Sequence, residues 1–100
     1  MPAYVIVEVE VTNPVVYEDY KRLAQETIHR YGGRYIVRGG KTEVLEGEAS
    51  KRMIVLEFPT FDKAKTWYRS PEYAYVKTLR ERSATSRLMI VEGLETPPQV

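Results

Sequence analysis

Hydrophobic and polar residues alternate in the first part of the chain. Within residues 3–11, every odd-numbered position is alanine or valine, whereas the even-numbered positions begin with Tyr4 and Ile6 and end with two glutamates. A period of two with β-branched residues is typical of a strand. We therefore expect the odd-numbered face of this strand to lie in a core, and the even-numbered face to be apolar at its start and acidic at its end.

The period then changes to that of a helix. Asn13 and Pro14 are typical of a helix start, because asparagine caps the first backbone N–H groups and proline at the first helical position loses no hydrogen bond. Gly32 and Gly33 are expected to end the helix, because glycine tolerates a left-handed cap. The stripe expected to be buried comprises Val16, Tyr20, Leu23, Thr27, Ile28 and Tyr31.

A second strand is predicted over residues 34–37, with Tyr35 and Val37 on one face and the two arginines on the other. Gly39 and Gly40 interrupt it, and a glycine pair in a strand pattern indicates a bulge, a bend or a close backbone approach. We expect the strand to continue over residues 42–45 after this kink and a polar turn to follow over residues 47–51.

A third strand over residues 53–58 is almost entirely apolar, so we expect it to be central and covered on both faces. Thr60 or Asp62 is expected to cap the helix that follows. Ser70 and Pro71 then restart a helix, with Ser70 as the cap and Pro71 at its first position. The last strand is predicted over residues 88–91.

The order of these elements is βαββαβ. Right-handed crossovers convert this order into a four-stranded antiparallel sheet with two helices on one face, which is the ferredoxin-like plait of the α+β class. We expect residues 1–93 to form this domain and residues 94–100 to form a polar, proline-rich tail.

The second face of the predicted sheet has no helix to cover it. Tyr4, Ile6 and alternate positions of the third strand would lie on this face. Large exposed apolar patches are uncommon on monomers, so we expect a homodimer that packs sheet against sheet around a barrel-like core. A monomer with a partly polar open face is the alternative.

Composition narrows the choice of partners. The 100 residues carry 15 Lys+Arg against 14 Asp+Glu, which leaves little positive charge for nucleic acid. There is no cysteine and only one histidine, so we expect no metal, no cofactor and no disulfide. Apolar runs are only a few residues long, which predicts no membrane span. The absence of cysteine suits a cytoplasmic protein.

A string rich in glycine and arginine, GGRYIVRGG, occupies residues 32–40. The elements that accompany it are residues 57–59 (EFP), Ala64, residues 67–68 (WY), residues 70–73 (SPEY), Arg80 and residues 91–93 (VEG). From residue 3 to residue 93 the chain resembles the bacterial DUF1330 family, a domain of unknown function in the dimeric α+β barrel superfamily. The resemblance implies a ferredoxin-like subunit and a dimer, but no reaction. Superfamily members include cofactor-free monooxygenases, lactone isomerases and haem-degrading enzymes, a likeness of fold alone.

Tyrosine is unusually frequent, with 8 residues against 2 phenylalanines and 1 tryptophan. Tyrosine suits half-wet clefts because its ring is apolar and its tip is polar. Trp67 and Tyr73 flank the predicted helix break, where they could stack on a flat ligand or simply pack in the core. The residues predicted to bind a small molecule between helices and sheet are Tyr20, Tyr35, Arg38, Trp67 and Tyr73.

Arg38 lies beside the second glycine pair. A guanidinium next to flexible backbone N–H groups suits a carboxylate. The alternative is a salt bridge from Arg38 to Glu57 or Glu92, next to a strand bend.

Two residues are candidates for acid–base chemistry. Glu57 lies in an apolar strand, where a carboxylate is either a general base with a raised pKa or a member of a buried ion pair. His29 is the only histidine and the default base, although a histidine in the last helical turn is also favoured at the surface by the helix dipole. The predicted function is binding of a small, partly apolar and anionic molecule. Cofactor-free catalysis with Glu57 or His29 as base, and a non-catalytic dimeric binding module, are the two alternatives.

Overall fold

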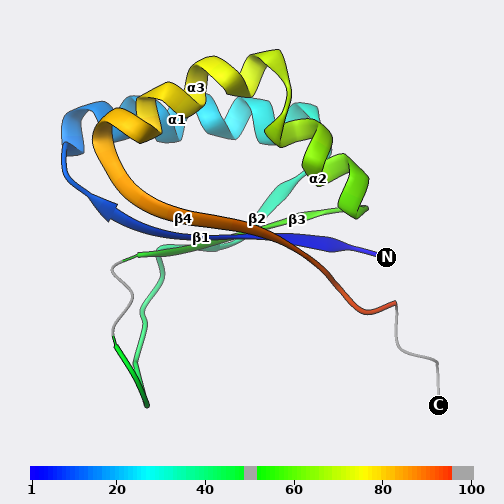
Figure 1. Cartoon of the computed structure of the whole chain (residues 1–100), viewed down its shortest axis with the longest axis horizontal. Coiled ribbons are helices and arrows are strands. Elements are labelled where there is room, and N and C mark those ends of the chain that lie inside the picture. Colours follow the sequence, from blue (N-terminus) through cyan, green and yellow to red (C-terminus); the bar gives the residue numbers. More distant parts are fainter. Residues whose placement is uncertain (49–51, 96–100) are drawn as a thin grey trace.

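A single antiparallel sheet carries three helices on one of its faces (Figure 1). The computed structural model describes residues 1–48 and 52–95. The elements in chain order are β1 (Ala3–Val11), α1 (Pro14–Arg30), β2 (Arg34–Arg38), β3 (Met53–Phe58), α2 (Phe61–Tyr68), α3 (Pro71–Ser83) and β4 (Ala84–Glu92). The strands lie in the order β2-β3-β1-β4, with β1 and β3 in the centre. The predicted α+β plait is confirmed, with three helices in place of two.

The helices begin where the sequence predicts. The side chains of Asn13, Thr60 and Ser70 each accept a hydrogen bond from the backbone N–H three residues further on. Of the two predicted caps for α2, Thr60 therefore fills the role. Pro14 and Pro71 lie in the first turns of α1 and α3, where no backbone donor is lost.

The second strand differs from its prediction in two ways. A bulge between Tyr35 and Val37 turns Arg38 to the face of Tyr35, so the expected sharing of a face by Tyr35 and Val37 is wrong. The expected continuation over residues 42–45 is also wrong, because the left-handed backbone of Gly39 (φ +66°) turns the chain away after Arg38. The end of the predicted polar turn, at residues 49–51, lies outside the described residues, as does the tail from residue 96.

The last strand is longer than predicted. It covers nine residues, Ala84–Glu92, because it pairs with the whole of β1, from Ala3 opposite Glu92 to Val11 opposite Ala84. The first half of β4 is mostly polar, so a prediction based on apolar residues did not include it.

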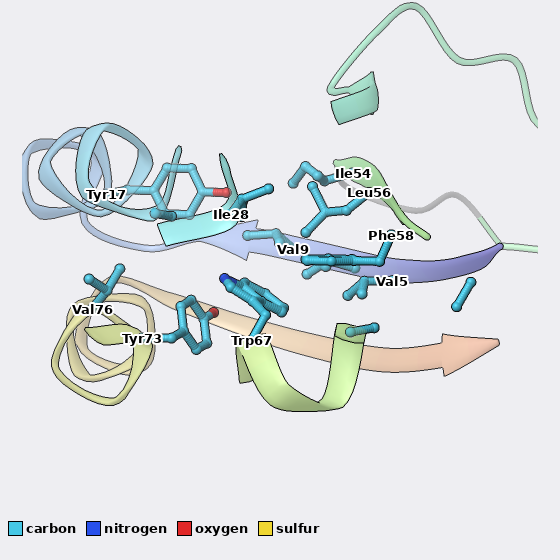
Figure 2. Packing of buried hydrophobic residues seen from close by; sticks show 14 residues of the cluster. Val5, Val9, Tyr17, Ile28, Ile54, Leu56, Phe58, Trp67, Tyr73 and Val76 are labelled. Carbon is cyan, nitrogen blue, oxygen red and sulfur yellow. The ribbon is translucent and has the colours of Figure 1, made fainter. Parts of the chain in front are cut away.

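The core lies between the sheet and the helices (Figure 2). On β1 the odd-numbered residues from Ala3 to Val9 are at most 6% exposed, as the alternation predicts. The buried positions of α1 are Tyr17, Ala24, Thr27 and Ile28. The buried face of α1 is therefore rotated relative to the predicted stripe: Val16 is only half-buried, and Tyr17 lies in the core instead.

None of the helices described in residues 1–48 and 52–95 has the length and apolarity needed to cross a bilayer.

On the uncovered face of the sheet, Ile6 lies opposite Val55 of β3 and Met89 of β4. These three side chains are half-buried or exposed, whereas the neighbours of Ile6 and Val55 on the helix-covered face are buried.

Gly33 joins α1 to β2 and touches the core directly. A Cβ at this position would lie 2.5 Å from Cζ of Phe58 and 2.9 Å from Cγ2 of Ile28. We expect Gly33→Ala to lower the free energy of unfolding by about 1–3 kcal/mol, because the added methyl overpacks the core. Gly40→Ala is the matched control, because nothing lies within 4 Å of its added Cβ. Urea denaturation followed by tryptophan fluorescence compares the two variants. Equal losses of stability would contradict this account of Gly33.

Candidate functional site

A small cavity lies between the sheet and the helices. Its apolar walls come from β1, β3 and α1, its rings from Tyr17, Tyr20, Tyr35 and Trp67, and its cations from Lys21, Arg52 and Arg80. Its volume of about 20 Å³ is enough for about one water molecule. The free protein therefore holds this cavity nearly closed.

The cavity has a buried end and an end nearer solvent. Arg80 and Trp67 are buried, whereas Tyr20, Tyr35 and Arg52 are half-buried. Because half-buried side chains can change rotamer without disrupting the core, access to the cavity lies on this second side, next to α1 and β2.

Arg80 is the most unusual residue of the cavity. It is 6% exposed, and its Nε and Nη1 atoms are buried with no hydrogen-bond partner among the described residues. A guanidinium stays charged at any physiological pH, and an unpaired buried charge costs several kcal/mol. No residue that lines the cavity is acidic. The site therefore holds a positive group whose partner is not supplied by the cavity itself.

Two tyrosines lie close to this charge. The hydroxyl oxygens of Tyr20 and Tyr73 are 2.9 Å apart, so one hydroxyl donates to the other. Burial raises the pKa of both phenols, and the nearby charge of Arg80 only partly opposes this effect. Both therefore stay protonated at neutral pH. They act as neutral hydrogen-bonding groups beside Arg80 and are poor bases.

Trp67 forms part of the wall and is itself fixed by the core. Its indole Nε1 donates to Oγ1 of Thr27 at 3.0 Å, and that hydroxyl donates to the carbonyl of Ala24 at 2.8 Å. Its ring packs 4.3 Å, centroid to centroid, from that of Tyr73, as the close view shows (Figure 2). Trp67 thus has its only donor satisfied, and it offers the cavity an apolar surface.

Arg38 lies outside the cavity lining. It is exposed, and its guanidinium stacks 4.4 Å from the centroid of the Tyr35 ring. The predicted salt bridge from Arg38 to Glu57 is not formed, because Glu57 pairs with Arg34 at 2.7 Å. A Cβ on Gly39 would collide with the guanidinium of Arg52, so this glycine makes room for a different arginine.

The two predicted bases lie away from the cavity. Glu57 points to the uncovered face of the sheet, since its neighbours Leu56 and Phe58 point to the core, and it accepts hydrogen bonds from Arg34. His29 is exposed in the last turn of α1. Neither residue is among those that line the cavity.

Of the predicted ligand-binding residues, the structure brings Tyr20, Tyr35 and Trp67 into the cavity lining and places Tyr73 directly behind Tyr20. Sequence analysis missed Arg80 and Arg52 as site residues. Arg80 had a visible signal, because it follows Leu79 on the apolar stripe of α3, where a charge is out of place. Arg52 had none.

Other features of the described residues offer less chemistry. Within residues 1–48 and 52–95, no group of three or more His, Cys, Asp or Glu side chains is placed to hold a metal ion. A wider depression of about 740 Å³ lies at Arg34 and Glu57, but it is open to solvent. Its two charges satisfy each other at 2.7 Å.

The fold and cavity together define a ferredoxin-like α+β protein with a closed internal site. The chain belongs to the family described as "Domain of unknown function (DUF1330)", whose model matches residues 2–94. This match confirms the resemblance to the family that the glycine- and arginine-rich string at residues 32–40 indicated. No match is found among curated proteins.

Solved structures share the fold at low sequence identity. The chain is similar to RPA0582, a protein of unknown function from Rhodopseudomonas palustris, with 20% identity, a TM-score of 0.77, and coverage of 95% of this chain and 84% of that chain. It is similar to SnoaB, a cofactor-independent oxygenase from Streptomyces nogalater, with 14% identity, a TM-score of 0.65 and 98% of each chain covered. A dimeric protein of unknown function with a ferredoxin-like fold from Bacteroides fragilis matches with 15% identity, a TM-score of 0.51, and coverage of 92% and 96%.

The unpaired charge of Arg80 predicts an unusual mutational effect. We expect Arg80→Met to raise the free energy of unfolding of the ligand-free protein by about 1–3 kcal/mol, because an apolar side chain of similar length replaces a desolvated cation. Arg82→Met is the control: Arg82 is exposed on the same helix, so its loss should change stability by less than about 0.5 kcal/mol. Thermal and urea denaturation measure both. A clear loss of stability in Arg80→Met would show that Arg80 has a structural partner.

Proposed function

We propose that this protein binds a small, partly apolar carboxylate in the cavity, with the Arg80 guanidinium as the anion-binding group. The observation that carries this proposal is the pair of buried Arg80 nitrogens without a hydrogen-bond partner. A carboxylate matches two parallel N–H donors of a guanidinium and neutralises its charge. The protonated hydroxyl of Tyr20, which lines the same cavity and is hydrogen-bonded to that of Tyr73, would offer the anion a neutral hydrogen-bonding group.

The closed form of the cavity fits binding with a small rearrangement. At about 20 Å³ the cavity excludes anything larger than water until side chains move. Tyr35 and Arg52 are half-buried and lie on the solvent side. Rotation of these side chains would open a path to Arg80 and leave the fixed Trp67 wall in place.

A cofactor-free reaction is the second candidate, and the fold shared with the cofactor-independent oxygenase SnoaB favours it. Arg80 would then stabilise an oxyanion that develops on the substrate. Binding without catalysis is preferred, because none of the residues lining the cavity is a carboxylate or an imidazole that could act as base. Glu57 and His29 would have no contact with a molecule held beside Arg80.

The single tryptophan gives a direct test, because its ring forms part of the cavity wall. We expect butyrate, in millimolar titration at constant ionic strength, to shift the Trp67 indole resonance of the wild type. Butyramide has nearly the same shape without the charge, and it should produce no such shift. The butyrate response should vanish in Arg80→Met and persist in Arg82→Met. A response to butyrate that survives in Arg80→Met would refute Arg80 as the anion site.

We also propose that two copies of the chain pair through the uncovered sheet face. Met89 and Val91 are 38% and 43% exposed there, and Tyr4, Ile6 and Val55 lie between or beside them. A continuous apolar face of this kind is uncommon on a monomer. The dimeric protein of the same fold from Bacteroides fragilis supports the choice of a second copy as the occupant.

Met89→Glu tests the homodimer, because it introduces a charge opposite Ile6 in the middle of this face. We expect the variant to sediment with the mass of one chain at micromolar concentration, where the wild type sediments with twice that mass. Val15→Glu, at a position 77% exposed on α1, should leave the dimer intact. A wild type that sediments as a single chain would rule the dimer out.

The remaining expectations from composition belong to the same proposal. They are a cytoplasmic location and function without a cofactor, a metal, nucleic acid or a membrane. They rest on the absence of cysteine, the single histidine, the short apolar runs and the net charge of +1.

A further inference from the structure

The cavity contains a second arginine with an unmet donor. The Nε atom of Arg52 is buried and has no hydrogen-bond partner among the described residues. Arg52 directly precedes β3 and lines the same cavity as Arg80 on α3. Its guanidinium lies beside Gly39, whose left-handed backbone (φ +66°) turns the chain after β2.

The two arginines act on different parts of the cavity. Burial raises the pKa of Tyr20, Tyr73 and Tyr35 in each case, but the opposing positive charge differs. For Tyr20 and Tyr73 this charge is that of Arg80. For Tyr35 it is that of Arg38 and Arg52. Arg80 is buried and Arg52 half-buried, so one cation marks the inner end and the other marks the solvent side.

The sheet side of the cavity that the two arginines share is largely apolar. Val7, Val9, Ile54 and Leu56 contribute the sheet side of the cavity lining. The third cation of the lining, Lys21, already has a partner, because its Nζ lies 2.8 Å from a carboxylate oxygen of Glu18. Among the residues that line the cavity, only the two arginines have buried side-chain nitrogens with no hydrogen-bond partner in the described part of the chain.

We propose that the ligand is a short dicarboxylate, with one carboxylate on Arg80, the other on Arg52 and the carbon chain against the apolar wall. This inference rests on the proposed function, since it assumes that Arg80 binds an anion. A single compact anion such as phosphate would place its charge at one end only. A monocarboxylate on Arg80 would leave the Arg52 donor unpaired, and an unmade hydrogen bond in a buried site costs affinity.

The test compares acids that differ only in the second carboxylate. Malonate, succinate and glutarate are titrated against propionate, butyrate and valerate, respectively, at constant ionic strength, with the Trp67 indole resonance as readout. We expect the best dicarboxylate to bind the wild type about tenfold or more tightly than its monocarboxylate partner, because it adds a hydrogen bond to a charged group. Arg52→Gln should lose this preference and bind the monocarboxylate as the wild type does. Arg38→Gln, at the exposed neighbouring arginine, should keep the preference.

The results distinguish the dicarboxylate proposal from the proposal that Arg80 binds an anion. If both acids of every pair bind the wild type equally, or if Arg52→Gln keeps the preference, the dicarboxylate assignment is overturned while anion binding at Arg80 stands. If no acid of either series shifts the indole resonance of the wild type, the anion site itself is wrong. The comparison of acids in the wild type needs no variant, so a folding defect in Arg52→Gln cannot hide the result.

Discussion

Two buried nitrogens of the Arg80 guanidinium have no hydrogen-bond partner among the described residues, and this raises the free energy of the folded chain. Helix α3 carries Arg80 from the cap at Ser70 to a position over the sheet. The protonated hydroxyls of Tyr20 and Tyr73 give it polar neighbours without neutralising its charge. A stability cost retained at one buried position is typical of a binding site, where function and stability favour different residues.

The rest of the fold keeps this cavity rigid on one side and adjustable on the other. Trp67 is held by its hydrogen bond to Thr27 and by ring packing, so the inner wall has little freedom to move. The solvent side is formed by half-buried side chains from β2 and from the start of β3. Arg38 lies on the cavity side of β2 after the bulge but stays exposed and stacks on Tyr35, whereas Arg52, beside Gly39, lines the cavity. The opposite face of the sheet carries the apolar side chains through which we propose that two copies pair, so one alternating pattern would serve both the core and the proposed dimer.

Much of the fold could be predicted because its signals are local. The alternation of β1 and the caps at Asn13 and Ser70 depend on neighbouring residues only. The bulge after Tyr35 and the polar half of β4 depend on strand pairing, which a single-chain pattern does not contain. The same limit applies to the site. The frequency of tyrosine predicted a partly polar cleft. The presence of Arg52 rather than Arg38 in the cavity lining, and the burial of two Arg80 nitrogens without a partner among the described residues, depend on tertiary packing.

The resonance of the Arg80 Nε–H group reports both on the burial of this guanidinium and on the anion binding that we propose for it. Nitrogen-detected NMR of the arginine side chains, with Arg80 assigned from its absence in Arg80→Met, is the direct measurement. The account predicts an Arg80 Nε–H that exchanges with water far more slowly than exposed arginines and moves downfield with butyrate but not with butyramide. An Arg80 Nε–H that exchanges as fast as those of exposed arginines, and does not respond to butyrate, would contradict it.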